Sequence, residues 1–436
     1  MPERSLADWL NLLESRHPSE IELGLHRVSM VWQRLQAEHG FNQQKSPLAI
    51  TVAGTNGKGS SLACMQAILL EHGYSTGMFT SPHFLHYNER ICLGGEPVAD
   101  QLIVDAFELI EAQCGDISLT YFEFGTLAAL VIFYQAQPDV MLLEVGLGGR
   151  LDAINIIDAD VAVLTSVALD HQDWLGDTRE AIAREKLGIA RSGRPLIVGE
   201  QDHPAGFEQM VAETGANALF AGKDFSLTAE DPFAVSLLCS HWKEPGQLEI
   251  DQLAQSSLLA INKTVALQAL LAAGIELEVA TSRKALQQVG LRGRQQKLNF
   301  RGVEVVLDVA HNPAAATQLS RSLAAQQGGC VAVASVLDDK DWSGILAAMS
   351  PVISHWHIAE ISQSSRASKG QYLLDLLYNA AQSGDLHQSI EEAFLQAVDA
   401  VSAASADSEA QRIVVFGSFH TVALVLNLIL AEVGIE

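Results

Sequence analysis

The run Gly54-Thr55-Asn56-Gly57-Lys58-Gly59-Ser60 has the residue types of a phosphate-binding loop. Glycines let backbone N–H groups close around a phosphate, and a helix that starts directly after the loop adds the positive end of its dipole. Lys58 supplies a mobile positive charge for the β- and γ-phosphates of a nucleotide. The spacing departs from the standard GxxxxGK[ST] loop, because Gly59 separates Lys58 from Ser60. A nucleotide-binding loop is therefore predicted, and an ordinary glycine-rich turn is the alternative.

Polar residues stand at the ends of three predicted strands: Ser81, Glu144 and the pair Asp170-His171. The carboxyl ends of parallel strands face the ligand crevice of an open sheet. We expect these side chains to converge near the glycine loop and to hold Mg²⁺, which prefers oxygen ligands and keeps several waters. The alternative for each residue alone is a loop cap with no metal.

Lys186 follows Arg184-Glu185 in the sequence and is expected early in a helix that begins after Thr178. From the sequence alone it reads as a solvated lysine paired with Glu185 or a nearby aspartate. Two runs in the second half also place polar groups after predicted strands, Asp308-Val309-Ala310-His311-Asn312-Pro313 and Phe416-Gly417-Ser418-Phe419-His420. Polar strand ends in both halves indicate two crevices that face one shared site.

The elements that must position these residues alternate between short apolar runs and helical patterns, which is typical of parallel α/β architecture. Strands are predicted at residues 48–53, 76–81, 139–145, 161–167 and 195–198, and then at 303–309, 331–336, 353–361 and 413–416. Helices are predicted at 60–72, 101–112 and 261–273, and short strand-like pieces at 220–250. We expect a P-loop-type parallel-sheet ATPase domain at residues 1–295 and a smaller Rossmann-like α/β domain at 296–436.

The amino-acid composition limits the binding partners and the compartment that we expect for this chain. The 27 basic and 52 acidic residues give a formal charge of 27 − 52 = −25, which disfavours nucleic acid and acidic membranes. There is neither a signal-peptide pattern nor an apolar run of eighteen residues. The five cysteines are scattered and never form a CxxC pair, which favours buried, reduced thiols in the cytoplasm.

Taken together, the motifs resemble the folylpolyglutamate synthase/dihydrofolate synthase family, relatives of the Mur ligases, and the resemblance covers nearly the whole chain. Residues 119–123, Leu-Thr-Tyr-Phe-Glu, look like the bacterial bifunctional type. The other segments that carry the resemblance are residues 21–25, 54–60, 80–83, 144–153, 168–171, 184–186 and 308–313.

The resemblance implies a site for ATP, magnesium and a pterin. It implies ATP contacts from Asn56, Gly57, Lys58, Gly59, Ser60, Asn262, Arg294 and Asp308. It implies magnesium ligands, for two ions, at Ser81, Glu144, His171 and a carbamylated Lys186. It implies catalytic roles for Lys58, His171 and Lys186 and pterin contacts from Glu20, Ile21, Glu22, Leu23, Thr120, Tyr121, Phe122, Glu123, Leu151, Asp152 and Ala153. The chain departs from the family pattern at Gln295-Gln296 and at Lys263-Thr264.

The implied activity is ATP-dependent amide formation through an acyl phosphate. L-glutamate would be joined to dihydropteroate and to reduced folates by a cytoplasmic monomer. Three alternatives remain: a Mur-type ligase of cell-wall precursors, a regulatory P-loop switch or kinase, and a non-catalytic binding protein. Residues 119–123 argue against the first, and the Asp308-to-Pro313 run argues against the second.

Overall fold

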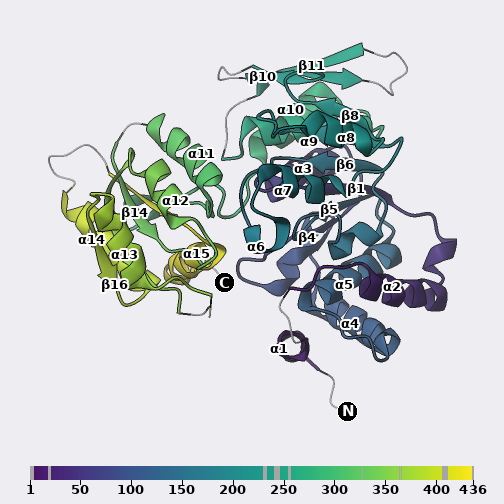
Figure 1. The fold of residues 1–436 in the computed structure, drawn as a ribbon, viewed down its shortest axis with the longest axis horizontal. Coiled ribbons are helices and arrows are strands. Elements are labelled where there is room, and N and C mark those ends of the chain that lie inside the picture. The colour runs from purple at the N-terminus through teal and green to yellow at the C-terminus, as the bar shows by residue number, and fades with distance from the viewer. Residues whose placement is uncertain are drawn as a thin grey trace. The chain divides into compact units, whose positions relative to one another are not determined.

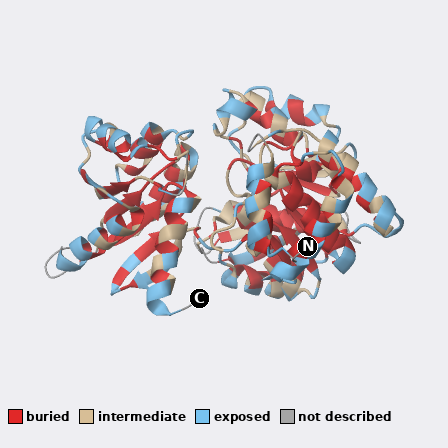
Figure 2. Ribbon diagram, turned by 90° about the horizontal axis from the view of Figure 1, so that it is seen from below, coloured by how far each residue is buried: buried red, intermediate tan, exposed pale blue. Residues whose placement is uncertain are grey.

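The chain divides into two compact units, Met1–Val289 and Gly290–Glu436. The computed structural model describes residues 4–17, 21–228, 233–239, 246–253, 257–326, 328–362, 364, 366–404 and 411–434. Each unit has its own sheet with helices on both faces (Figure 1). Figure 2 shows that buried residues concentrate in the sheets and on the helix faces that cover them.

The first unit is built on an eight-stranded sheet in the order β4-β3-β2-β5-β1-β6-β7-β8. From β2 to β8 in this order the neighbours pair in parallel, and β3 and β4 add an antiparallel edge. The bounds are β1 (Leu48–Ala53), β2 (Thr76–Phe79), β3 (Ile91–Leu93), β4 (Glu96–Pro97), β5 (Val140–Glu144), β6 (Val161–Leu164), β7 (Pro195–Val198) and β8 (Asn217–Phe220). The central strands are buried along nearly their whole length, because helices cover both faces.

Helices cover the two faces of this sheet in separate groups. α3, α9 and α10 pack on one face, whereas α5 packs on the other beneath α1, α2 and α4. The helices of this unit are α1 (Leu6–Arg16), α2 (His26–His39), α3 (Lys58–Glu71), α4 (Asp100–Cys114), α5 (Tyr121–Ala136), α6 (Gln172–Leu175), α7 (Arg179–Leu187), α8 (Phe207–Glu213), α9 (Ala260–Ala272) and α10 (Val279–Gln288), with 3₁₀ turns η1 (Phe41–Gln43), η2 (Tyr87–Arg90) and η3 (Ala153–Ile156).

A small antiparallel sheet, β11-β10-β9, completes the first unit. Its strands are β9 (Ser226–Leu227), β10 (Phe233–Cys239) and β11 (Gly246–Leu253). Burial alternates along β10, as expected when one face is covered and the other is solvated. The covered face rests on α9, where the Gln268 amide bonds both backbone groups of Leu238 at 2.9 Å.

The second unit has a six-stranded sheet in the order β12-β13-β17-β14-β15-β16, parallel except for β12. α11, α12 and α13 share one core with the sheet, and α14 and α15 pack on the opposite face. The bounds are β12 (Gln296–Phe300), β13 (Val303–Leu307), β14 (Cys330–Ala334), β15 (Ile353–Ala359), β16 (Gly384–His387), β17 (Arg412–Phe416), α11 (Pro313–Ala324), α12 (Trp342–Met349), α13 (Gly370–Asn379), α14 (Ile390–Ala404) and α15 (Phe419–Val433).

The predicted fold class, a parallel-sheet domain followed by a smaller α/β domain, is confirmed. Two local predictions are wrong. β6 ends at Leu164, so His171 lies in a loop well beyond the strand. Lys186 lies in the last turn of α7 and not near its start. The five cysteines are all buried and unpaired. Within the described part of the chain, every helix is too short or too polar to cross a bilayer.

Candidate functional site

The glycine loop turns the chain from β1 into α3. Gly54 and Gly57 have φ angles of +155° and +88°, which residues with a Cβ rarely adopt. A Cβ on Gly54 would lie 1.8 Å from Thr165 Oγ1, so this position has no room for a side chain. Lys58 is the first residue of α3, which places the loop N–H groups at a helix N-terminus.

The segment after β6 holds the loop in place. Ser166 Oγ accepts the Asn56 N–H at 2.9 Å, and Thr165 Oγ1 donates to the Asn56 carbonyl at 2.6 Å. The Thr55 N–H bonds the Ser166 carbonyl at 2.9 Å. Sequence reasoning missed Thr165 and Ser166, although the change from apolar to polar residues after the β6 run was a signal. These bonds fix the loop conformation across 110 residues of sequence.

Lys58 and Asn262 lie at the same loop. Lys58 Nζ donates to the Gly54 carbonyl at 3.0 Å. Asn262, near the start of α9, is buried, and its Oδ1 would lie 2.6 Å from a Cβ on Gly57. Two of the predicted ATP contacts from distant parts of the sequence are therefore brought together. Gly59 and Ser60 follow in the first turn of α3.

Ser81 and Glu144 meet at the carboxyl ends of the adjacent strands β2 and β5. The Ser81 N–H donates to Glu144 Oε2 at 3.1 Å, and only 5% of Glu144 is exposed. A buried carboxylate beside a serine is a donor set that a divalent cation favours. The described residues contain no cluster of three or more His, Cys, Asp and Glu that matches a metal site. A cation here would therefore need ligands of other kinds.

Lys186 is buried, with 5% of its surface exposed, so the interpretation as a solvated lysine is wrong. Burial is the largest cause that lowers its pKa to about 7. The positive charge of Lys58 lowers it further, whereas Asp170 and Asp152 act in the opposite direction. Glu185 pairs with Arg150 at 2.8 Å instead of with Lys186.

Asp152 connects the same region to the run that follows β5. Burial raises the pKa of its carboxyl group to about 6, against bonds from backbone N–H groups and the charge of Lys58. Its two oxygens accept the N–H groups of Leu147 and Ile154 at 2.8 and 3.0 Å. Lys58 thus acts on the pKa of both Lys186 and Asp152, so the three residues lie in one region.

His171 is the residue directly before α6 and has the left-handed φ of +51°. Its N–H bonds the side chain of its neighbour Asp170 at 3.0 Å. Asp170 is also one of the charges that act on Lys186. The loop with Asp170 and His171 therefore lies at the same end of the sheet as Lys186.

The segments predicted to contact a pterin are joined by one arginine. Arg27 donates to the Glu22 carbonyl at 2.9 Å and to Glu123 Oε1 at 3.0 Å, and it also bonds the Glu22 carboxylate. Glu123 is buried and forms a capping box with Thr120 at the start of α5. The Gly24 N–H bonds the Leu151 carbonyl at 3.1 Å and so adds the third segment. Sequence reasoning missed Arg27.

The remaining pterin candidates adjoin these contacts. Phe122 covers Gly146, where a Cβ would lie 2.6 Å from its ring, and packs 5.8 Å from Phe79 between ring centroids. Ala153 begins η3 directly after Asp152. Ile21 and Leu23 flank Glu22 in the first segment. Glu20 lies outside the described residues.

Arg294 and Asp308 form a second group, in the second unit. Asp308 is buried directly after β13, and burial raises the pKa of its carboxyl group, with the charge of Arg294 as the main opposing effect. Asp308 accepts the Gln295 N–H at 3.0 Å, and Arg294 lies over the Phe419 ring, 5.4 Å from its centroid. Gln296 Oε1 accepts the Gly293 N–H at 3.0 Å. Of the two glutamines that depart from the family pattern, Gln296 thus stabilises the turn that carries Arg294 with its side chain, and Gln295 does so with its backbone N–H.

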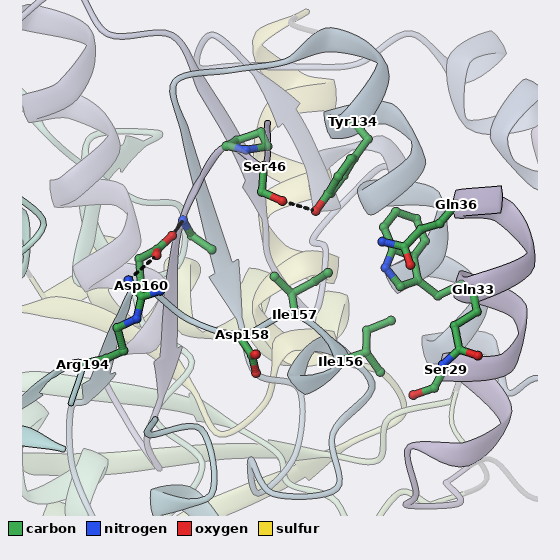
Figure 3. A pocket seen from close by; sticks show the side chains of 13 residues that line it. Ser29, Gln33, Gln36, Ser46, Tyr134, Ile156, Ile157, Asp158, Asp160 and Arg194 are labelled. Atoms are coloured by element: carbon green, nitrogen blue, oxygen red, sulfur yellow. Dashed lines mark hydrogen bonds and ion pairs between the residues drawn. The ribbon is translucent and has the colours of Figure 1, made fainter. Parts of the chain in front are cut away.

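Figure 3 shows a pocket of about 380 Å³ in the first unit. It lies at the end of the large sheet that is opposite to the glycine loop. Its wall includes Pro47, Asp160 and Arg194, which precede β1, β6 and β7, whereas the glycine loop follows β1. Asp160 pairs with Arg194 at 2.9 Å, and Ser46 bonds the Tyr134 hydroxyl at 3.0 Å. None of the predicted site residues lines this pocket.

Comparisons with known proteins define first the class of protein. Residues 52–231 match the Mur ligase middle domain, and residues 293–419 match the Mur ligase, glutamate ligase domain. The two matches contain the glycine loop of the first unit and the Arg294–Asp308 group of the second.

Curated relatives then give the family. The dihydrofolate synthase/folylpolyglutamate synthase of Escherichia coli strain K12 is 42% identical over 97% of this chain and 95% of its own length. The protein of the same description from Haemophilus influenzae is 36% identical over 96% of each chain. The chain belongs to the dihydrofolate synthase/folylpolyglutamate synthase family.

Solved structures agree with this assignment. The structure of E. coli FolC in complex with DHPP and ADP has a TM-score of 0.89 and 41% identity, and covers 99% of this chain and 100% of that one. The structure of the bifunctional folylpolyglutamate synthase/dihydrofolate synthase from Yersinia pestis, complexed with AMPPNP and Mn ion, has a TM-score of 0.87 and 38% identity over the whole of both chains.

Proposed function

We propose that the chain is an ATP-dependent carboxylate–amine ligase of folate synthesis. It joins L-glutamate to dihydropteroate and adds L-glutamate to tetrahydrofolate and its glutamylated forms. One observation carries the proposal: Lys58 lies close enough to both Lys186 and Asp152 to lower the pKa of each, and Asp152 acts on the pKa of Lys186. The phosphate loop, a candidate metal ligand and a candidate pterin segment therefore occupy one region.

The reaction balances without a covalent enzyme intermediate. A carboxylate oxygen of the pterin substrate attacks the γ-phosphorus of ATP, and ADP leaves. The amino group of L-glutamate then attacks the carbonyl carbon of the acyl phosphate, and phosphate leaves with the oxygen that came from the carboxylate. Such steps depend on positioning and charge stabilisation. Lys58, at the helix N-terminus, would stabilise the transferring phosphoryl group.

The ATP contacts are assigned in two groups. Asn56, Gly57, Lys58, Gly59 and Ser60 surround the phosphates, with Asn262 against Gly57. Arg294 and Asp308 contribute from the second unit. The pterin is assigned to Glu20, Ile21, Glu22, Leu23, Thr120, Tyr121, Phe122, Glu123, Leu151, Asp152 and Ala153, and the bonds of Arg27 support the grouping of these segments.

We assign two Mg²⁺ ions to Ser81, Glu144, His171 and Lys186. The contact between Ser81 and the buried carboxylate of Glu144 fits a divalent cation. When bound, the ions neutralise phosphate charge during transfer. His171 and Lys186 complete the ligand set from the neighbouring loop and from α7.

Lys186 acts as its carbamate in this proposal. With a pKa of about 7, the buried amine is neutral in a large fraction of molecules at neutral pH, and a neutral amine attacks CO₂ with loss of one proton. The product offers two oxygens where an ammonium would repel a cation. The unmodified amine, whose charged form the carboxylates of Asp170 and Asp152 favour, is the competing state.

ADP formation tests the proposed function. We expect ADP release only when ATP and L-glutamate are present together with dihydropteroate or tetrahydrofolate. Activity with tetrahydrofolate alone would remove the dihydrofolate synthase half of the proposal. Activity with a nucleotide-linked muramyl substrate would favour a Mur-type ligase instead.

The compartment and assembly state are proposed separately. Buried, unpaired cysteines fit a reducing cytoplasm. We assign the chain to that compartment as a monomer, and light scattering at assay concentration would measure the mass directly.

A further inference from the structure

Arg90 presents a guanidinium between two aromatic rings at the edge of the candidate site. Its Cζ lies 5.3 Å from the Tyr87 ring centroid and 5.6 Å from that of Tyr121. The two rings are perpendicular, with centroids 5.7 Å apart. Arg90 Nε donates to His83 Nδ1 at 2.8 Å, which fixes the plane of the guanidinium. The side chain is held without use of its two Nη groups.

The lack of a carboxylate partner at Arg90 is unusual in this chain. Acidic residues outnumber basic ones 52 to 27, and most described arginines bond a carboxylate. Arg16 pairs with Glu111, for example, and Arg283 pairs with Asp251 at 2.6 Å. Within the part of the chain that the structure describes, no carboxylate pairs with Arg90, although it is half-buried. A fixed guanidinium fork is suited to an external carboxylate.

The position of Arg90 indicates which external carboxylate it would bind. His83, its partner, is two residues after Ser81, which bonds Glu144. Tyr121, on its other side, belongs to the segment assigned to the pterin. The fork therefore lies between the candidate metal ligands and the candidate pterin contacts, where the acidic end of a bound pterin substrate would reach.

We propose that Arg90 binds a carboxylate of the pterin-bearing substrate. The inference rests on the proposed function for the identity of that substrate. Two sources share this chemistry: the benzoate carboxylate of dihydropteroate and the glutamate carboxylates of tetrahydrofolate. Tyr87 and Tyr121 pack against the guanidinium, and the bond to His83 leaves both Nη groups for a paired contact with the two carboxylate oxygens.

Steady-state kinetics of Arg90→Gln and Arg90→Lys test the assignment. We expect KM for dihydropteroate, tetrahydrofolate or both to rise about tenfold to one hundredfold, since hydrogen bonds to charged groups contribute on this scale. KM for ATP should stay unchanged. The lysine variant keeps the charge but loses the fork, so it should rescue only part of the loss. Arg283→Gln, which removes a paired arginine of α10, is the matched control.

Kinetics with each substrate distinguish the two possible carboxylates. A rise for dihydropteroate alone assigns the benzoate carboxylate, and a rise for tetrahydrofolate alone assigns the glutamate carboxylates. A change confined to L-glutamate, to ATP or to kcat would overturn the proposal. Comparable unfolding midpoints of Arg90→Gln and Arg283→Gln would show that folding is not the cause.

Binding provides a readout that does not need turnover. Titration calorimetry would compare pteroate with its neutral carboxamide. If Arg90 binds the benzoate carboxylate, the wild type should bind pteroate at least about tenfold more tightly than the carboxamide, and Arg90→Gln should bind both alike. An unchanged preference in Arg90→Gln excludes the benzoate carboxylate, and together with an unchanged KM for tetrahydrofolate it would contradict the inference. If the wild type binds pteroate in this way but forms no ADP with L-glutamate, the proposed function fails while the Arg90 site stands.

Discussion

Lys58 illustrates how the site works at the scale of single residues. Its ammonium lies 3.0 Å from the Gly54 carbonyl, at the first position of α3, and is surrounded by bonds that hold the loop. Removing the side chain deletes a charge and little buried apolar surface. The effect should therefore fall on the reaction and not on folding.

We expect Lys58→Ala to lower kcat by about 10²-fold or more, since it removes one stabilising charge at the transferring phosphoryl group. The measurement is ADP formation at saturating substrates, with circular dichroism to check the fold. Lys284→Ala, on the surface and paired with Glu71, is the control. A folded Lys58→Ala variant with near-normal kcat would exclude the phosphate-loop assignment.

Lys186 gives a prediction with a direct spectroscopic signal. In ¹³C-bicarbonate the wild type should show one carbamate carbon resonance that is absent from Lys186→Ala. The variant should have lost activity, and a short carboxylic acid should restore part of it by replacing the carbamate oxygens. An active wild type without a carbamate signal would contradict the carbamate and leave Lys186 as an unmodified amine.

Single site residues were predictable from the sequence where a polar residue stands at the end of a predicted strand. Ser81 follows β2, Glu144 ends the adjacent strand β5, and the two residues do meet. Arg27 and Arg90 were not predictable, because their roles depend on contacts with side chains far away in the sequence. Arg27 bonds Glu123 across 96 positions, and no spacing rule encodes that pairing.

At the scale of elements, the β1–α3 turn depends on glycine at one position. A Cβ on Gly54 would collide with Thr165 Oγ1, whereas Gly73, after α3, has a φ of +80° and open space. Gly73→Ala should cost only backbone strain, about 1–2 kcal/mol.

Gly54→Ala should therefore lower the unfolding midpoint more than Gly73→Ala does and should also raise KM for ATP. Thermal unfolding and steady-state kinetics of both variants would measure this. Equal effects of the two substitutions on both quantities would mean that the turn tolerates a side chain.

The edge strand β16 and its neighbour β15 carry a histidine pair, of which His357 is buried, and this pair predicts acid sensitivity. His357 Nδ1 lies 2.9 Å from His387 Nε2, and His357 Nε2 is buried without a hydrogen-bond partner. Burial is the main cause that lowers the pKa of His357 from 6.5 to about 4, and the charges of His387 and His355 add to it. Asp385 opposes the shift, and Glu392 on α14 acts on His387 in the same sense.

These two pKa values determine how the stability of the folded chain changes with pH. The unfolded chain takes up the His357 proton near pH 6.5, and the folded chain only near pH 4. The stabilising contribution is thus complete above pH 6.5 and is lost as the pH falls towards 4. The drop in unfolding midpoint between pH 7.5 and pH 5 should be smaller in His357→Gln than in the wild type. His26→Gln, an exposed position, should leave the drop unchanged, and an equal drop in all three proteins would contradict the prediction.

Helices and strands were predictable from the sequence where the spacing of apolar residues matched the burial of the element. Strands at residues 48–53 and 195–198 have the predicted bounds, because parallel strands covered on both faces read as apolar runs. The run after Val161 was predicted too long: β6 ends at Leu164, and the hydroxyls of Thr165 and Ser166 then donate to the Asn56 carbonyl. α5 is buried on nearly every side, so its sequence shows little helical period and was not assigned a helix.

At the scale of the whole molecule, both units place their candidate residues after parallel strands. Asp308 follows β13 as Glu144 ends β5, which is the position where open α/β sheets bind ligands. The sequence predicted this repeated architecture from its alternating pattern. An overall charge of −25 fits anionic substrates only because Lys58, Arg90 and Arg294 concentrate positive charge at particular points.

The fate of one oxygen atom tests the central claim most directly. Dihydropteroate labelled with ¹⁸O in its carboxylate would be incubated with ATP, Mg²⁺ and L-glutamate, and the products analysed by mass spectrometry. Formation of an acyl phosphate predicts that each dihydrofolate formed is matched by one ADP and by one phosphate that carries a single ¹⁸O. Unlabelled phosphate, or ADP release that does not depend on L-glutamate, would contradict the ligase mechanism.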